Sequence, residues 1–448
     1  MRAALDWSFS PNGDGSVGVA LTAAAVPLWI RLSLLSECGR RAKQALGALR
    51  ALGTHDLYDK MRLQAALGAS TPEAQEMGRV FTEVLDIAES LGDPEYQLRA
   101  LRGLYYYYAG TGQYHAALPI ARRFHDLAVS GVDPIDRLFA ERMMGVAKHF
   151  VGDHLGARRH LEHVLTHYVI ADYGRDVIRF QDVVRFGADL QVSTRLFLAR
   201  VLWMQGFADQ AEHTIEMAIA EAQATGHAMS VCLALGFGAC PIALWTGDLT
   251  AAARHTEMLL NRARKHDLPF YSALGSRFGK IVTLTASELD LVSLPPLTDV
   301  DEITEPSLTF RFLTGLSELA EALAHAGRNA EALAVAEEGI KQSETGWLAP
   351  ELLRVKGELL LLQSNGAATE TAEDFFRQAL DAARQHKALS WELRAVTSLA
   401  RLLRNQNRHA DAVACLKPVY DRFTEGFGTA DLTTAKRLLD ELSEIRHR

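Results

Sequence analysis

Arginine recurs in helical segments along the chain and is the residue type with the clearest chemical use. Seven arginines are expected in the first helices of successive hairpins, and a tyrosine is expected on the same helix face as the first two of them. The set is Arg99, Arg102, Tyr106, Arg142, Arg195, Arg311, Arg354 and Arg394. A groove lined by guanidinium and aromatic groups would suit an acidic peptide, a carboxylate metabolite or a nucleotide. The alternative is that each arginine pairs with a nearby acid, such as Glu141 or Glu392, and only adds solubility.

Three histidines lie at helical spacing in the segment RHLEHVLTH. His160, His163 and His167 fall at i, i+3 and i+7, which places them on one helix face. Neutral imidazoles in this arrangement could hold zinc or nickel, and they could also form a pH-sensitive surface patch. Because no cysteine or carboxylate is placed to complete a ligand set, a solvated face is favoured. We therefore expect neither a metal nor another cofactor.

The segment SPNGDGS, residues 10–16, could pass for a loop that holds a metal or a phosphate. If Asp14 and Gly15 were the fifth and sixth positions of a calcium loop, the twelfth would be Leu21, which cannot supply a carboxylate. A phosphate loop would need a lysine or arginine nearby, and the segment has none. It is therefore predicted to separate two helices.

Known catalytic patterns are missing from the sequence. It contains no G-x-S-x-G, no H-E-x-x-H and no cysteine with an evident histidine partner. We expect a protein without catalysis of its own, and the alternative is an enzyme with a site in the concave groove. The run Tyr105–Tyr108 is expected to pack mainly in the core, with ligand contact in a groove as the minority interpretation.

Composition indicates a folded and largely helical protein of the cytoplasm. Hydrophobic residues make up 48% and charged residues 23% of the 448, and the net charge is −8. This charge argues against nucleic-acid binding by the chain alone, although a direct DNA-binding regulator stays an alternative. The four cysteines form no CxxC pair and fit reduced thiols. The apolar stretch 17–30 is too short to span a membrane, and the first residues do not resemble a signal peptide.

A recurring turn organises the chain. In each copy a glycine or asparagine is followed about five residues later by an alanine. The turn residues lie at 112, 152, 206, 247, 327, 366 and 407, so that successive turns are 40, 54, 41, 80, 39 and 41 residues apart. The turn residue is expected to end one helix in the left-handed conformation, and the alanine to let the next helix approach closely. A small residue also lies seven positions before most turns: Gly145, Ala199, Cys240, Ala320 and Ala400.

These features predict an all-α fold, a tetratricopeptide-like right-handed superhelix of roughly ten antiparallel helix hairpins with a period of about 40 residues. The expected parts are N-terminal helical repeats at 1–92, repeats at 93–290 with an insertion near 169–191, an acidic proline-rich loop at 291–307, and C-terminal repeats at 308–448. In such an array the first helices line the concave surface. The arginines described above are therefore expected to share one groove.

Several segments resemble one protein family. Residues 389–442, which begin LSWELRAVTSLARLL, are similar to the C-terminal end of bacterial STAND-class ATP-binding transcriptional regulators, which often carry a winged-helix or nucleotide-cyclase domain. Residues 4–49 resemble the segment that follows their nucleotide-binding domain, and GDHLGARRHLEHVL and ACPIALWTGDLTAAAR resemble the helical region between. No G-x-x-x-x-G-K-[ST] occurs, so the family's ATPase role cannot be transferred to any residue.

The resemblance implies a helical sensor arm that receives a signal and controls an ATPase. The helix expected at residue 1 would then be the joint to a nucleotide-binding domain. The expected function is a non-catalytic sensor or scaffold in signal transduction and transcriptional regulation. It is expected to bind a protein partner or a small acidic effector, without contacting nucleic acid or membrane directly.

Overall fold

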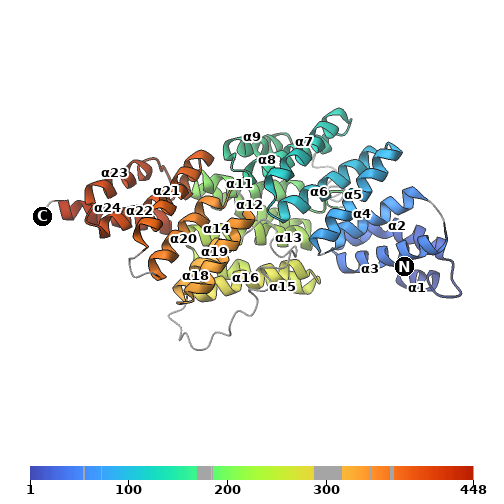
Figure 1. The fold of residues 1–448 in the computed structure, drawn as a ribbon. Coiled ribbons are helices and arrows are strands. Elements are labelled where there is room, and N and C mark those ends of the chain that lie inside the picture. Colours follow the sequence, from blue (N-terminus) through green and yellow to red (C-terminus); the bar gives the residue numbers. More distant parts are fainter. Residues whose placement is uncertain are drawn as a thin grey trace.

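The computed structural model describes residues 1–53, 56–71, 73–168, 183, 185–286, 315–343, 346–363 and 368–446. Within these residues the chain is α-helical and contains no strand. Figure 1 shows an elongated array of helix hairpins with the two termini at opposite ends. The expected all-α tetratricopeptide-like superhelix is confirmed.

The N-terminal hairpins begin almost at the first residue. Their helices are α1 (Arg2–Ser8), α2 (Gly15–Arg31), α3 (Leu35–Ala51), α4 (Leu57–Ser70), α5 (Ala74–Leu91), α6 (Pro94–Gly110), α7 (Tyr114–Ser130), α8 (Pro134–Phe150) and α9 (His154–His167). Between α1 and α2, Asp14 accepts hydrogen bonds from the backbone N–H groups of Ser16 and Val17 and so caps α2. The predicted helix break at SPNGDGS is therefore confirmed.

The middle of the chain contains one helix interrupted by a π-helical turn. Its helices are α11 (Leu190–Met204), α12 (Ala208–Thr225), α13 (Ala228–Ala234), the π-helical η1 (Leu235–Ala239), α14 (Cys240–Thr246), α15 (Leu249–Lys265) and α16 (Pro269–Ala286). Pro241 has no N–H to donate to the carbonyl of Phe237 four residues earlier. The buried Arg200 donates to that carbonyl instead, from Nη1 at 3.2 Å.

The stretch from Ala228 to Thr246 is long and apolar enough to cross a membrane by length and composition. Within the chain, however, 83% of its apolar window is buried against other helices. A core helix of a folded array passes the same test, and the burial of this one accounts for its composition.

The C-terminal hairpins complete the array. They comprise α18 (Leu316–His325), α19 (Asn329–Ser343), α20 (Ala349–Gln363), α21 (Thr369–His386), α22 (Leu389–Asn405), α23 (His409–Tyr420) and α24 (Ala430–Arg446). The buried cores overlap along the chain: two small clusters lie within residues 5–67, a large one runs from 61 to 391, and another from 372 to 442. The predicted domain boundaries stay predictions. The loop 291–307, and residues 169–182 and 184 of the predicted insertion, lie outside the described residues.

The recurring turn has the predicted geometry wherever it is described. The turn residues have positive φ angles of 79°, 87°, 90°, 84°, 73° and 62° at Gly112, Gly152, Gly206, Gly247, Gly327 and Asn407. The alanines that follow these six residues, at 117, 157, 211, 252, 332 and 412, are all buried, and so is Ala372. At Gly145 a Cβ atom would lie 2.8 Å from the side chain of Leu161 in the neighbouring helix. Small residues therefore set the close helix spacing, as predicted.

Turns in the N-terminal and middle parts of the chain also touch helices of the C-terminal part. A Cβ on Gly112 would lie 2.4 Å from the carbonyl oxygen of Gln342, and one on Gly247 would lie 2.5 Å from Cβ of Ala430. The backbone N–H of Trp347 donates to the carbonyl of Phe150 at 3.0 Å. Hairpins far apart in the sequence therefore pack against each other, and the hairpin turns form part of that contact.

Alanine substitutions at two of the turn glycines separate the effect of the left-handed backbone conformation from the effect of close contact with another hairpin. Gly327→Ala is expected to cost about 1 kcal/mol of stability, because only the left-handed conformation opposes it and no atom lies within 4 Å of its Cβ. Gly112→Ala is expected to cost at least about 1 kcal/mol more, because its Cβ also meets Gln342. Urea unfolding followed by circular dichroism measures both. Equal losses would contradict the contact between the halves.

Candidate functional site

A pocket of about 460 Å³ opens on the surface formed by every second helix of the C-terminal half. Helices α18, α20, α22 and α24 each contribute to it, and these are the first helices of successive hairpins. Its lining residues are Glu321, Ala324, His325, Arg354, Val355, Glu358, Leu359, Leu362, Arg394, Thr397, Ser398, Arg401, Ala430, Asp431 and Thr434. The pocket combines charged groups with an apolar strip of Val355, Leu359 and Leu362 from α20.

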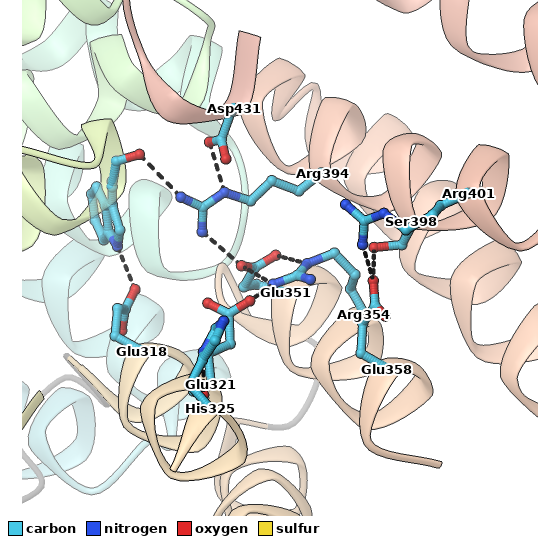
Figure 2. A network of polar contacts seen from close by, with 11 residues as sticks. Glu318, Glu321, His325, Glu351, Arg354, Glu358, Arg394, Ser398, Arg401 and Asp431 are labelled. Carbon is cyan, nitrogen blue, oxygen red and sulfur yellow. Dashed lines mark hydrogen bonds and ion pairs between the residues drawn. The ribbon is translucent and has the colours of Figure 1, made fainter. Parts of the chain in front are cut away.

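Glu351 holds the two central arginines of the pocket from beneath (Figure 2). Arg354 donates to both of its carboxylate oxygens at 2.8 Å, and Arg394 Nη1 donates to Oε1 at 2.7 Å. The Glu351 side chain is completely buried. Burial alone would raise its pKa, but the charges and hydrogen bonds of Arg354 and Arg394 hold it at about 2. Glu351 is therefore ionised at neutral pH.

Arg394 also connects the pocket to the middle of the chain. Its Nη2 donates to the carbonyl of Trp245 at 3.0 Å, and its Nε donates to Asp431 at 2.7 Å. The indole N–H of Trp245 in turn donates to Glu318 at 2.6 Å. Burial raises the pKa of Glu318. These bonds connect α14 with α18 and α22, and α22 with α24.

Three carboxylates of the pocket each use only one oxygen within the described part of the chain. Glu321 accepts from Arg354 through Oε1, Glu358 accepts from Ser398 and Arg401 through Oε1, and Asp431 accepts from Arg394 through Oδ2. Their side chains are 35%, 28% and 24% exposed. The second oxygen of each is therefore free to accept a hydrogen bond from a ligand. In contrast, Arg394 directs Nε and both terminal nitrogens to groups of the chain.

The structure divides the predicted arginines into separate places. Arg354 and Arg394 meet in the pocket, while Arg99, Arg102, Tyr106 and Arg142 lie in the N-terminal half on α6 and α8. Arg195 of α11 donates from Nε to both oxygens of Glu221 at 3.0 Å. Arg311 lies outside the described residues.

The acids suggested as arginine partners have other partners. Glu141 accepts from His160 at 2.6 Å and from His125 at 3.2 Å, and not from Arg142. Glu392 accepts from Arg384 and Arg422, and not from Arg394. Glu141 and Glu392 are therefore not the partners of the predicted arginines. The general alternative, that the arginines pair with acids of the chain, holds for four of those that the structure describes: Arg99, Arg195, Arg354 and Arg394. Glu141 and Glu392 are close in sequence to Arg142 and Arg394, but the packing of the helices places other basic side chains closer to them.

The three histidines of the predicted face do not act as one set. His160 contacts Glu141, whereas the rings of His163 and His167 stack on each other with centroids 4.0 Å apart. In the described ranges, no group of three or more histidine, cysteine, aspartate or glutamate side chains could hold a metal ion. Burial also raises the pKa of all four thiols, to about 11 for Cys38 and Cys415 and about 12 for Cys232 and Cys240. These thiols are therefore not activated as nucleophiles.

The tyrosine run is divided between the core and the surface. Tyr105 is completely buried, and the following three tyrosines are half-buried. Core packing is thus the role of Tyr105. Tyr106 accepts a hydrogen bond from Arg142 at its hydroxyl.

The carboxylates that define the pocket were not found from the sequence. Glu351 and Arg354 are three residues apart on one helix, a spacing that could have signalled their pairing. Glu321, Glu358 and Asp431 come from three different helices, and Asp431 lies 37 residues from the arginine it holds. Only the packing order of the helices brings them together.

Comparison with known proteins gives similarity in fold only. No family model matches the sequence, and no curated protein matches it. Among solved structures, the Rap protein complexed with Competence and Sporulation Factor is 13% identical, with 95% of this chain and 99% of that chain covered and a TM-score of 0.47. Yeast Tom70 is 11% identical, with 97% of each chain covered and a TM-score of 0.35, and the P58(IPK) TPR domain is 13% identical, with 92% and 98% covered and a TM-score of 0.27. The chain is therefore similar to helical-repeat proteins at a level that carries no functional inference.

Proposed function

We propose that this protein is a non-catalytic helical-repeat scaffold that binds a protein partner in the C-terminal pocket, through a lysine or arginine of that partner. The observation that carries the proposal is the set of three carboxylates, Glu321, Glu358 and Asp431, each with one oxygen left free beside an apolar strip. A basic side chain has an aliphatic stem and a cationic end, which match the strip and the carboxylates respectively.

The balance of charge supports a cationic ligand. Three arginines and three carboxylates line the pocket, and Glu351 beneath them adds a fourth carboxylate. Arg354 and Arg394 are held by Glu351, Glu321 and Asp431, so their charges are already neutralised within the chain. An acidic ligand would have to displace these buried pairs, whereas an ammonium or guanidinium group would add to them. This pocket thus disfavours the small acidic effector expected from the arginine pattern.

The role of such binding in the cell follows from the sequence resemblance alone. We propose that partner binding controls a signal-transduction ATPase that regulates transcription, because several segments resemble the helical arm of STAND-class regulators. In this proposal the chain is a cytoplasmic sensor arm, and the chemistry belongs to the ATPase.

A peptide array tests the proposed specificity. Hexapeptides with Lys, Arg, Gln, Leu or Glu at each position are probed with the purified chain, and bound protein is measured by fluorescence. We expect preference for Lys or Arg next to an apolar residue, because such a residue reaches both the carboxylates and the α20 strip. The variant Glu321→Gln/Glu358→Gln keeps the side-chain shape and should lose this preference at least tenfold.

The matched control is Glu331→Gln on α19, which removes a partly exposed carboxylate that pairs with Arg328 and does not line the pocket. It should bind the array as the unmodified chain does. A preference for Glu over Lys, or equal signals from the double variant and the control, would overturn the proposal.

A further inference from the structure

A second cluster of charged side chains lies in the N-terminal half, and in contrast to the carboxylate-bearing C-terminal pocket it is made of arginines. It consists of Arg99 and Arg102 on α6, Arg142 on α8, and Arg185. Burial and, to a smaller extent, the positive charges of the other three arginines lower the pKa of Arg102 to about 10, and Arg102 donates to the backbone carbonyl of Arg185. We call these four residues the arginine cluster.

The carboxylates near the arginine cluster are used by only two of its members. Arg99 donates to Glu95 at 2.6 Å, and Arg185 donates to both Asp133 and Asp136. Burial raises the pKa of Asp136 to about 6, which still leaves this carboxylate ionised at pH 7.5 and paired with Arg185. These acids therefore leave Arg102 and Arg142 to find other partners.

Arg102 and Arg142 contact no carboxylate within the described ranges. Arg102 donates to the backbone carbonyl of Arg185. Arg142 is 3% exposed, with its guanidinium 5.6 Å from the ring centre of Phe139 and 5.4 Å from that of Phe197. Its Nη1 donates to the hydroxyl of Tyr106 at 3.3 Å, while its Nε makes no hydrogen bond. Burying a guanidinium without an acid normally costs several kcal/mol.

The hydroxyl of Tyr106 offers a further hydrogen-bond donor beside these arginines. Because the hydroxyl oxygen accepts from Arg142, its own hydrogen remains available to an acceptor. Tyr106 and Arg102 are both half-buried and lie four residues apart on α6, so they share one helix face. One side of the hairpin therefore carries the guanidinium of Arg102 and the hydroxyl of Tyr106, and the guanidinium of Arg142 contacts that hydroxyl.

We propose that Arg102 and Tyr106, supported by Arg142, bind the oxyanion of a small acidic ligand, a carboxylate or a phosphate. Bidentate donation from Arg102 matches the oxygens of either group, and the hydroxyl of Tyr106 supplies one further donor. The anion would neutralise the charge of Arg102 and Arg142 that the fold leaves uncompensated. This site is separate from the C-terminal pocket and does not depend on the function proposed for it.

The test uses thermal unfolding of the full chain at pH 7.5, in sodium phosphate, sodium succinate or sodium chloride at equal ionic strength. We expect phosphate or succinate to raise Tm above the chloride value with a saturating dependence on concentration. The better of the two identifies the class of oxyanion. In chloride, Arg102→Gln should unfold at the same temperature as the unmodified chain or higher, because it removes a repelling charge. The same variant should weaken the apparent affinity for the oxyanion at least tenfold.

Two further variants keep the test decisive. Tyr106→Phe keeps the ring and removes one donor, so we expect a smaller loss of oxyanion affinity. Arg195→Gln removes an arginine that Glu221 already neutralises, and it should respond to the oxyanion as the unmodified chain does. Equal Tm values in all three salts, an equal response from Arg102→Gln and Arg195→Gln, or a Tm in chloride lowered by Arg102→Gln would overturn the proposal.

Discussion

Glu351→Gln is expected to lower the free energy of unfolding by about 3–5 kcal/mol, because it leaves two buried guanidinium groups without their shared carboxylate. Arg354 and Arg394 both donate to Glu351, whose side chain is completely buried. Chemical denaturation followed by tryptophan fluorescence and circular dichroism measures the loss. Glu331→Gln, which removes one member of a partly exposed pair at the start of α19, should change stability by less than about 1 kcal/mol.

The lowered pKa of Glu351 also leads to a prediction of how the free energy of unfolding depends on pH. Its pKa is about 2 in the folded chain and 4.5 as the ordinary value for glutamate. A lowered pKa means that the stabilisation is fully present above pH 4.5 and is lost as pH falls toward 2. The difference in stability between the unmodified chain and Glu351→Gln should therefore shrink over this interval. A variant as stable as the unmodified chain at pH 7 would contradict the buried ion pairs.

Trp391→Ala is expected to cost about 3–5 kcal/mol, because it leaves a large cavity where the middle and C-terminal hairpins meet. The Trp391 ring is completely buried, its centroid is 4.8 Å from that of Trp203, and its indole N–H donates to the carbonyl of Trp347 at 3.2 Å. Loss of the ring should also loosen α22 from α11. Near-ultraviolet circular dichroism and urea unfolding report both effects.

The matched control is Trp7→Ala, because Trp7 lies on α1 and is 57% exposed. It should cost less than about 1 kcal/mol. Similar losses for the two variants would show that the tryptophan contact does not hold the halves together.

The fold was predictable from the sequence because its determinants are local. Gly112 and Asn407 both lie at the left-handed ends of helices, and the alanines five residues later lie in the helix that follows. These relations join residues within one hairpin, so spacing along the chain is enough to find them. The same holds for SPNGDGS, where Asp14 caps the helix that begins next to it.

The candidate site was only partly predictable because its partners are distant in sequence. Arg354 and Arg394 were found from their recurrence on the first helices, and they do line one pocket. Their chemistry was not evident, because Glu321 and Asp431 neutralise them from α18 and α24. Which helices become neighbours decides whether an arginine faces a ligand or a carboxylate of its own chain. Arg102, in contrast, contacts no carboxylate in the described ranges, and only the structure distinguishes it from the other two.

The most direct test of the proposed function is a double-mutant cycle on the tightest peptide from the array. Isothermal titration measures its Kd, and that of the same peptide with its basic residue replaced by norleucine, against the unmodified chain and against Glu321→Gln/Glu358→Gln. The proposal predicts that norleucine weakens binding at least tenfold to the unmodified chain and by less than about twofold to the variant, since the lost charge has no carboxylate to meet there. An equal loss against both proteins would contradict recognition of a basic side chain by this pocket.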